Sequence, residues 1–461
     1  MSRFESFIEN IKNKNILIQG LGLNGGGVGT AKFFLENSIP VRITDLKSAE
    51  ELIDSTAQLD EYGDKVTYVL GTHRDEDFIW ADIVVKGPGV RPSNPYIQTA
   101  IAHGAQIISD IEIFASIVDC PLYAVTGSKG KSGTVSCIYQ IFKTAQPDNA
   151  FIGGNITISP LSFYHKVNTD SLVILELSSW QLRDLHNCGV RFHGAAFTNL
   201  MHDHQNYYNG MEDYLADKMV IAENQTDEDF IILPQNDNYV GYDKVNTAAE
   251  KFCFGTNDDA DIAYNSQTGT YQFGDVVLFS NDDIHVLGTH NVANLMLAAG
   301  FCYCVGIEPD IIRRGIQSFR GTPFRLEKIA EINGVSFIND TTATIPEAAV
   351  SAIKSLQNVI WIGGGNDKNL DFSCMTDAAA VPKAIYLLPG DGTDKMLPYL
   401  ADRKPQISED LDSLVRSAFE HAESGDVILF SPGATSFGLF ANEFDRGRKF
   451  NECVDRIKSS P

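Results

Sequence analysis

The segment AVTGSKGKSGT at positions 124–134 carries the strongest chemical signal in the sequence. Gly127 and Gly130 allow the backbone to wrap around an anion, so that successive N–H groups point at phosphate oxygens. Lys131 can reach terminal phosphates, and the hydroxyl of Ser132 can hold Mg²⁺. The two glycines are closer together than in the GxxxxGK[ST] loop. The segment therefore predicts a variant phosphate-binding loop, with a glycine turn that carries incidental lysines as the alternative.

A second glycine-rich loop, QGLGLNGGGVG at positions 19–29, follows the first apolar run. Glycines there permit the close approach of a phosphate to the start of a helix. Asp45 ends the next predicted strand, where a carboxylate could bind a ribose hydroxyl. A dinucleotide, another nucleotide ligand and a simple glycine turn are all compatible with this pattern.

Polar groups that suit a cation follow two further apolar runs. In LELSSWQL, at 175–182, Glu176 can ligate a cation held at Ser132, because Mg²⁺ takes a few protein oxygens beside phosphate. The alternative is that Ser178 and its neighbour only cap a helix. His204 and Lys218 belong to a polar cluster, TNLMHDHQNYY to YLADK, that follows the next strand.

More polar positions lie in the second half of the chain. Asn291 and Asn294 fall one turn apart in a predicted helix, which suits two amide contacts to a base or phosphate. Three loops, INDTTAT, GGGNDKNLDF and SPGATSFGLF, each follow a predicted strand. We expect these loops to converge on one rim.

Apolar runs of strand length alternate with helical patterns along most of the chain. This alternation indicates βαβ units and parallel sheets, whose ligands bind at the carboxyl ends of the strands, where the polar loops begin. A stretch at 255–287 instead has the pattern of antiparallel hairpins. The predicted strands are 15–19, 40–45, 83–86, 122–126, 171–177, 194–199, 229–234, 335–339, 359–363, 384–388 and 426–431.

A chain of 461 residues suggests about three α/β domains. Cys120 and Pro121 precede the strand that leads into the phosphate loop, and a helical pattern ends in Gly and Pro within SFRGTPFR at 318–325. We therefore predict domains at 1–118, 119–318 and 319–461.

Composition excludes several classes of protein. The sequence has 36 Lys and Arg against 60 Asp and Glu, a formal charge of −24, whereas a general nucleic-acid binder needs clustered basic side chains. The 8 cysteines are scattered without a CxxC pair, which favours reduced thiols over a disulfide frame or zinc site. No run of 18 apolar residues and no apolar leader is present, so we expect a cytoplasmic protein without membrane insertion.

In this order, the motifs resemble the Mur ligase family over nearly the whole chain. The resemblance rests on DIEIF followed by TGSKGKS, ELSSWQL, DH followed by YLADK, HNVANLMLAA, FRLE, NDTTAT, GGNDK, SPGATS and FDRG. It implies a Rossmann-like N-terminal domain for a UDP-linked substrate, a central ATPase domain and a Rossmann-like C-terminal domain for an amino acid. It also implies a monomeric, ATP-dependent, ADP-forming amide ligase of peptidoglycan precursor synthesis, which joins glutamate to UDP-N-acetylmuramoyl-L-alanine through an acyl phosphate.

Individual roles follow from the resemblance by position. ATP contacts are implied at Gly127, Ser128, Lys129, Gly130, Lys131, Ser132, Asn291, Asn294, Arg325 and Asp340. Two Mg²⁺ ions are implied at Ser132, Glu176, His204 and a carbamylated Lys218, with Lys131, His204 and Lys218 acting in catalysis. Substrate contacts are implied at Gly22, Leu23, Asp45, Asn155, Ser178 and Gln181 for the UDP-linked substrate, and at Thr344, Lys368 and Ser436 for the amino acid.

Some positions depart from the family pattern. Lys129 stands where the family loop has Asn, and Gly133 follows Ser132. Thr342 replaces the lysine of N-D-S-K-A-T, and Glu443 stands where an aromatic residue commonly flanks the bound glutamate. Glu443 would repel an anionic amino acid unless it points away from the site or pairs with a cation such as Arg446.

The alternatives concern the amino acid and the reaction. D-glutamate is favoured, with L-glutamate, another acidic amino acid or a cationic or neutral one as alternatives. Other reactions are those of another Mur-type ligase or a folate-type polyglutamate ligase. Outside this class, an NAD-dependent dehydrogenase would use the first glycine loop, and a regulatory module would bind nucleotide without catalysis.

Overall fold

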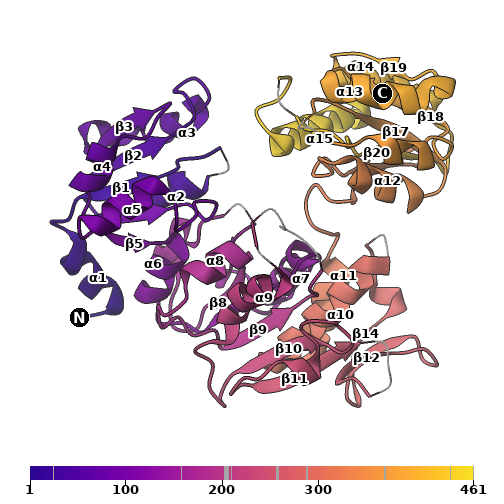
Figure 1. Ribbon diagram of the computed structural model, residues 1–461. Helices are drawn as coiled ribbons and strands as arrows, with labels where there is room; N and C mark the ends of the chain where they lie inside the picture. Colours follow the sequence, from indigo (N-terminus) through magenta and orange to yellow (C-terminus); the bar gives the residue numbers. More distant parts are fainter. Residues whose placement is uncertain are drawn as a thin grey trace. The chain divides into compact units, whose positions relative to one another are not determined.

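The computed structural model describes residues 1–23, 25–156, 158–201, 207–208, 210–255, 259–286, 289–367, 370–436 and 438–459. The chain forms two compact units, Met1–Ile284 with His290–Phe319, and His285–Thr289 with Arg320–Pro461 (Figure 1). The expected α/β class and parallel sheets are confirmed. The domain limits at 118 and 318 stay predictions. Among the described residues, no helix is long and apolar enough to cross a bilayer.

The N-terminal sheet is parallel, with the strand order β3-β2-β1-β4-β5. Its central strand is buried on both faces: Ile16 and Ile18 enter one core, and Leu17 enters the other with Phe78. Double burial of this kind explains why the strand reads as a continuous apolar run. The elements are α1 (Arg3–Ile11), β1 (Ile16–Gln19), α2 (Gly26–Glu36), β2 (Val41–Asp45), α3 (Ile53–Ala57), β3 (Val66–Leu70), α4 (Asp75–Trp80), β4 (Ile83–Lys86), α5 (Pro95–Ala102), β5 (Gln106–Ile108) and α6 (Asp110–Ile117).

The central sheet has the order β14-β13-β12-β11-β10-β9-β6-β8-β7. Its strands are parallel from β7 to β12, and β12, β13 and β14 form the antiparallel hairpins expected at 255–287. The elements are β6 (Leu122–Thr126), α7 (Lys131–Ala145), β7 (Ala150–Gly154), β8 (Leu172–Glu176), α8 (Ser179–Asp184), β9 (Gly194–Phe197), α9 (Met211–Met219), β10 (Phe230–Pro234), β11 (Glu250–Gly255), β12 (Ile262–Asn265), β13 (Thr270–Phe273), β14 (Val276–Ser280), α10 (Thr289–Cys304) and α11 (Pro309–Ser318).

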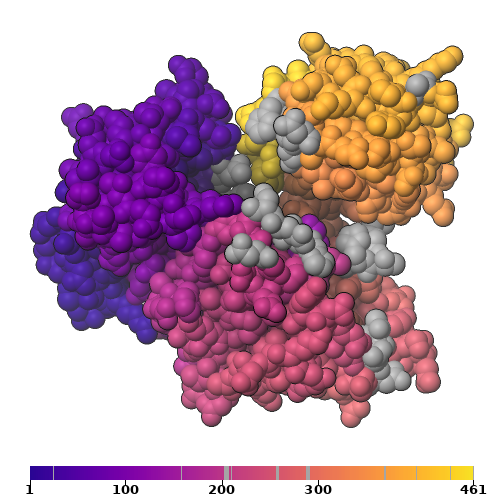
Figure 2. All heavy atoms as spheres, viewed as in Figure 1, coloured from indigo at the N-terminus to yellow at the C-terminus, as the bar shows by residue number. Residues whose placement is uncertain are grey.

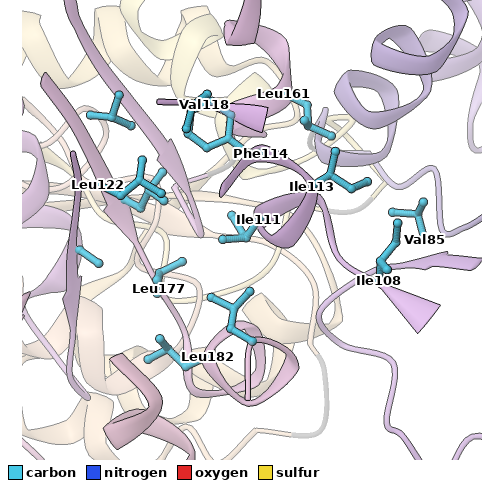
Figure 3. Packing of buried hydrophobic residues seen from close by; sticks show 14 of the residues in the cluster. Val85, Ile108, Ile111, Ile113, Phe114, Val118, Leu122, Leu161, Leu177 and Leu182 are labelled. Carbon is cyan, nitrogen blue, oxygen red and sulfur yellow. The ribbon is translucent and has the colours of Figure 1, made fainter. Parts of the chain in front are cut away.

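One hydrophobic core joins the N-terminal and central sheets. Helix α6 lies between them, with Ile113 near Val85 of the N-terminal sheet and Ile111 toward Leu177 and Leu182 of the central domain (Figure 3). The violet atoms of the N-terminal domain adjoin the magenta atoms of the central domain in Figure 2. The shared core holds the two sheets together in one compact unit.

The C-terminal sheet has the order β15-β16-β20-β17-β18-β19, with β15 and β16 antiparallel and the other pairs parallel. Ile360 and Ile362 of β17 enter one core, and Trp361 enters the core on the opposite face. The elements are β15 (Glu327–Ile332), β16 (Val335–Asn339), α12 (Pro346–Lys354), β17 (Val359–Gly364), β18 (Ala384–Leu388), α13 (Asp391–Leu400), β19 (Gln406–Ile407), α14 (Leu411–His421), β20 (Val427–Phe430) and α15 (Glu443–Ser459).

Candidate active site

The phosphate loop connects β6 to the start of α7, as its sequence predicts. Gly127 has φ +142° and Gly130 has φ +87°, both in the region that favours glycine. A Cβ at Gly127 would lie 2.0 Å from Oγ1 of Thr198, and one at Gly130 would lie 2.6 Å from Oδ1 of Asn294. The loop is therefore closely packed from both sides, and the N-terminus of α7 faces it, which is the geometry of an anion site.

The residues after β9 support this loop. Oγ1 of Thr198 and Nδ2 of Asn199 donate to the carbonyl of Lys129, at 2.6 and 3.0 Å. The N–H of Lys129 donates in turn to Oδ1 of Asn199 at 3.0 Å. Sequence reasoning missed both supporting residues, because it took them as the last two residues of the predicted strand 194–199, whereas β9 ends at Phe197.

Two lysines converge beneath the loop. Nζ of Lys131 donates to the carbonyls of Gly127 and Ser128, at 2.9 and 3.0 Å. Nζ of Lys218, from α9, donates to the same Gly127 carbonyl at 2.8 Å and to Oγ1 of Thr126 at 3.2 Å. Because both Nζ atoms donate to the same carbonyl oxygen, the two lysine side chains end close to each other. Lys218 is 1 % exposed, so this positive charge is concentrated at the bottom of the loop.

Asn291 and Asn294 both lie in α10, with Nδ2 of Asn294 3.5 Å from Oδ1 of Asn291. A Cβ at Gly133 would lie 2.8 Å from Nδ2 of Asn294. The departure at Gly133 is explained by this contact, because the glycine leaves room for the asparagine against the first turn of α7.

Glu176 ends β8 beside the phosphate loop and is 2 % exposed. Its Oε1 accepts a hydrogen bond from Nδ2 of Asn155 at 2.8 Å, whereas its Oε2 has no hydrogen-bond partner among the described residues. A buried carboxylate oxygen without a partner is costly unless a cation approaches it. The donor set fits Mg²⁺, which takes one or two carboxylates with hydroxyl and phosphate oxygens.

Ser132, the second residue of α7, is half-buried and offers its hydroxyl at the start of that helix. The described residues contain no cluster of three or more His, Cys, Asp or Glu side chains that could hold a metal ion by itself. His204, the expected ligand of a second ion, lies outside the described residues, as does Lys368.

A pocket of about 370 Å³ lies where the N-terminal and central domains meet. The predicted substrate residues Gly22, Leu23, Asp45, Asn155 and Gln181 all line it. Its lining also contains polar residues that sequence reasoning did not assign to the site, namely Gln19, Thr30, Lys86, Asp110 and Ser159. Burial raises the pKa of the Asp110 carboxyl, and Oγ of Ser159, which donates to it at 2.8 Å, opposes that shift.

The carboxylate of Asp45 holds the first glycine loop. Its Oδ2 accepts the N–H groups of Leu21 and Gly22, at 2.9 and 3.0 Å, and its Oδ1 accepts that of Lys47 at 2.9 Å. Both oxygens are therefore engaged by the chain's own backbone. This arrangement disfavours the dehydrogenase alternative, which needs the carboxylate for a ribose.

Ser178 and Gln181 form a capping box at the start of α8. Oγ of Ser178 accepts the N–H of Gln181 at 3.3 Å, and Oε1 of Gln181 accepts the N–H of Ser178 at 3.1 Å. The helix-cap alternative is thus confirmed for Ser178, while Gln181 also reaches the pocket.

In the C-terminal unit, Asp340 directly follows β16 and holds two segments together. Its Oδ2 accepts from Oγ of Ser431 at 2.7 Å, and its Oδ1 accepts from the N–H of Leu326 at 3.1 Å. Burial raises the pKa of Asp340 to about 6. Phe324 and Leu326 have φ of +66° and +43°, so the exposed Arg325 stands between two residues in a strained conformation.

The three polar loops of this unit meet, as expected. The backbones of Asn366 and Thr435 exchange hydrogen bonds at 3.1 and 2.9 Å, and the N–H of Gly433 donates to the carbonyl of Ala343 at 2.8 Å. Thr344 and Ser436 lie in two of these loops, the first half-buried and the second buried.

Arg446 is fully buried and connects two of the loops. It donates to the carbonyl and hydroxyl of Thr341, at 2.8 and 3.0 Å, and to the carbonyl of Ala434 at 3.1 Å. Burial lowers its pKa to about 9, and the charge of Glu443 opposes that shift. Arg446 and Glu443 form no ion pair among the described residues, because two carbonyl oxygens and a hydroxyl accept the hydrogen bonds of the guanidinium. The departure at Thr342 has a structural role, since its hydroxyl donates to the carbonyl of Phe324 at 2.8 Å.

Comparisons with known proteins agree with this architecture. Residues 14–109 match the family model "Mur ligase MurD-like, N-terminal domain", and residues 125–302 match "Mur ligase middle domain". A protein of Borreliella afzelii named UDP-N-acetylmuramoylalanine–D-glutamate ligase is 39 % identical, with 98 % of this chain and 99 % of that one covered. A protein of the same name from a Roseiflexus species is 34 % identical, with 96 % and 99 % covered.

Among solved structures, the UDP-N-acetylmuramate-alanine ligase MurC of Thermotoga maritima has the same fold, with a TM-score of 0.62. It is 18 % identical and covers 97 % of this chain and 100 % of its own. Matches to two domain models, and relatives that align over nearly the full length, lead to one assignment. The chain belongs to the Mur ligase family of ATP-dependent ligases.

Proposed function

We propose that this enzyme joins D-glutamate to UDP-N-acetylmuramoyl-L-alanine and converts ATP to ADP and phosphate in the same reaction. The full-length relatives that carry this activity in their names support the proposal. The structural observation that carries it is the hydrogen bond from Asn155 to Glu176. Asn155 lines the pocket and Glu176 ends the strand beside the phosphate loop, so a substrate carboxylate can approach a terminal phosphate there.

The reaction needs a phosphoryl transfer followed by an acyl transfer. An oxygen of the alanyl carboxylate attacks the γ-phosphorus, and the bond from that phosphorus to the β,γ-bridging oxygen breaks to release ADP. The amine of glutamate then attacks the acyl carbon of the acyl phosphate, loses a proton, and inorganic phosphate leaves. Such chemistry depends on position and charge neutralisation, which the loop N–H groups and Lys131 supply.

The proposed ATP site begins at the phosphate loop. Lys131 and the backbone of Gly127 to Ser132 bind the β- and γ-phosphates. Further ATP contacts are proposed at Asn291, Asn294, Arg325 and Asp340. Ser132 and Glu176 would hold Mg²⁺, which neutralises phosphate charge when bound. The partnerless Oε2 of Glu176 supports this assignment.

Lys218 is proposed to work as a carbamate, with His204 as a ligand of a second Mg²⁺ ion. Its amine shares the Gly127 carbonyl with Lys131, so carbamylation would replace one of two adjacent cations by an anion. The resulting carboxylate would lie beside the γ-phosphate and supply another oxygen ligand for a divalent cation.

The remaining roles concern the substrates. The site proposed for the UDP-linked substrate consists of Gly22, Leu23, Asp45, Asn155, Ser178 and Gln181. Within it, Asp45 holds the first glycine loop and Ser178 caps the helix that faces the substrate. Thr344, Lys368 and Ser436 are proposed donors to the carboxylates of glutamate. We further propose that the enzyme is a monomer. We also propose that it works in the cytoplasm, where ATP and UDP-linked precursors are available.

The experiment that tests the function measures phosphate release with UDP-N-acetylmuramoyl-L-alanine, ATP and Mg²⁺. D-Glu, L-Glu, D-Asp, L-Lys and meso-diaminopimelate are compared under identical conditions. D-Glu should be turned over fastest. L-Lys should be rejected strongly, because a site that pairs a side-chain carboxylate leaves buried donors unsatisfied with an amino acid that lacks it. A clear preference for either diamino acid would overturn the assignment, and Glu443 would then be the first residue to examine.

A further inference from the structure

The substrate pocket contains a buried ion pair that the roles above do not use. Lys86 ends β4 and lines the pocket, and its Nζ lies 2.5 Å from Oδ2 of Asp184, the last residue of α8. Both side chains are 6 % exposed. Because β4 belongs to the N-terminal sheet and α8 to the central domain, the pair connects the two walls of the pocket.

Lys86 supplies positive charge to a pocket whose other charged side chains, among the described residues, are carboxylates. Among the described residues of the lining, Lys86 is the one cationic side chain, whereas Asp45 and Asp110 contribute carboxylates. A UDP-linked acid carries a diphosphate and a carboxylate, so it needs positive charge where it binds. Within the described lining, that charge can come from Lys86.

The hydrogen bonds of Lys86 leave it able to bind a ligand. Its described acceptors are Oδ2 of Asp184 and the carbonyl of Val90, at 3.2 Å, and an ammonium has three N–H groups. Nη2 of Arg183 lies 3.8 Å from the other oxygen of Asp184, so the three charged groups together keep a net positive charge. Burial lowers the pKa of Lys86, and the carboxylate of Asp184 opposes that shift.

A neighbouring side chain independently indicates a ligand at this place. Gln19 ends β1 and pairs with Lys86 in the parallel register, so the two side chains leave the sheet on the same face. Gln19 lines the pocket, is 2 % exposed, and its Oε1 has no hydrogen-bond partner among the described residues. A bound ligand with an N–H or O–H group could donate to this buried amide oxygen.

We propose that Lys86 binds an anionic oxygen of the UDP-linked substrate, held in place by Asp184 across the domain boundary. Asp184 is a positioning residue in this arrangement, because it contacts Lys86 and lies outside the pocket lining. This inference rests on the proposed function for the identity of the ligand.

The test compares the Lys86→Met and Asp184→Asn variants with wild type and with Lys65→Met, an exposed lysine of the same domain. The KM for UDP-N-acetylmuramoyl-L-alanine, the KM for ATP and kcat are measured for each. Loss of a charge-assisted hydrogen bond predicts a rise in the first KM of roughly 10- to 100-fold for Lys86→Met. Asp184→Asn should raise the same KM by a smaller factor, with kcat and the KM for ATP close to wild type in both variants.

The outcomes separate the two proposals. Absence of wild-type turnover with this substrate overturns the proposed function. Wild-type turnover, together with a KM in Lys86→Met that changes no more than in Lys65→Met, overturns the role of Lys86 alone. If Lys86→Met does not fold, as judged by thermal unfolding, Lys86→Gln replaces it, because glutamine removes the charge but keeps a polar side chain with N–H donors. Lys86→Arg retains the cation and should recover part of the affinity.

Discussion

Removing the ammonium of Lys131 separates the catalytic from the structural importance of the phosphate loop. In Lys131→Met, the loop loses two hydrogen bonds to the carbonyls of Gly127 and Ser128. Each contributes about 1 kcal/mol to stability. A cation at the N-terminus of a helix is unfavourable by about 0.3–1 kcal/mol, so its removal offsets part of that loss.

The net cost to the fold is therefore about 1 kcal/mol. For a domain of 150–250 residues, this lowers Tm by about 2–4 °C. The effect on the rate is much larger, because loss of one preorganised electrostatic contact reduces kcat by about 10²–10³. Such a rate loss corresponds to about 3–4 kcal/mol of transition-state stabilisation.

Two quantities are measured for each variant. Activity is the rate of ATP-dependent phosphate release, and stability is the Tm of thermal unfolding followed by circular dichroism. The matched control is Lys143→Met, which removes an exposed lysine from the last turn of the same helix and should retain full turnover. Turnover of Lys131→Met within a few-fold of wild type would refute the assignment of Lys131 to the phosphates. If the Tm of Lys131→Met falls well below that of Lys143→Met, and its activity is lost through unfolding, the role of Lys131 is mainly structural.

Two further perturbations test the lysine carbamate and the buried aspartate. Lys218→Ala should lose turnover and regain part of it with short-chain carboxylic acids, while Lys131→Met should not; a wild-type rate unaffected by removal of CO₂ and bicarbonate would mean that Lys218 is an ordinary amine. Burial raises the pKa of Asp340 from 3.8 to about 6, so the native state disfavours its ionised form. The free energy of unfolding should therefore fall by up to about 3 kcal/mol as pH rises from 4 to 7. Urea unfolding of Asp340→Asn should lack this component, and an identical pH dependence in variant and wild type would contradict it.

The chain's local patterns determined much of the architecture. Alternation of apolar runs with helical patterns predicted the parallel sheets, because strands buried on both faces must be continuously apolar. Gly127 and Gly130 predicted the tight phosphate loop, because positive φ and close approach both require glycine. The position of polar loops after strands predicted which loops meet, since parallel strands end at one edge.

Short strands were missed for a physical reason. The segments at β5 and β7 are QII and AFIGG, too short or too rich in glycine to read as strands. Their stability comes from hydrogen bonds to β4 and β8, which no local pattern records.

The tertiary structure alone decided how charged and polar residues pair. Lys86 and Asp184 are 98 positions apart, and Arg446 reaches Thr341 from 105 positions away. Asp45 fitted a ribose ligand by sequence, yet its oxygens hold backbone N–H groups. A single charged residue has no periodicity that reveals its partner. Its role is set by which groups burial brings within hydrogen-bond distance, because a buried charge must be compensated wherever the fold places it.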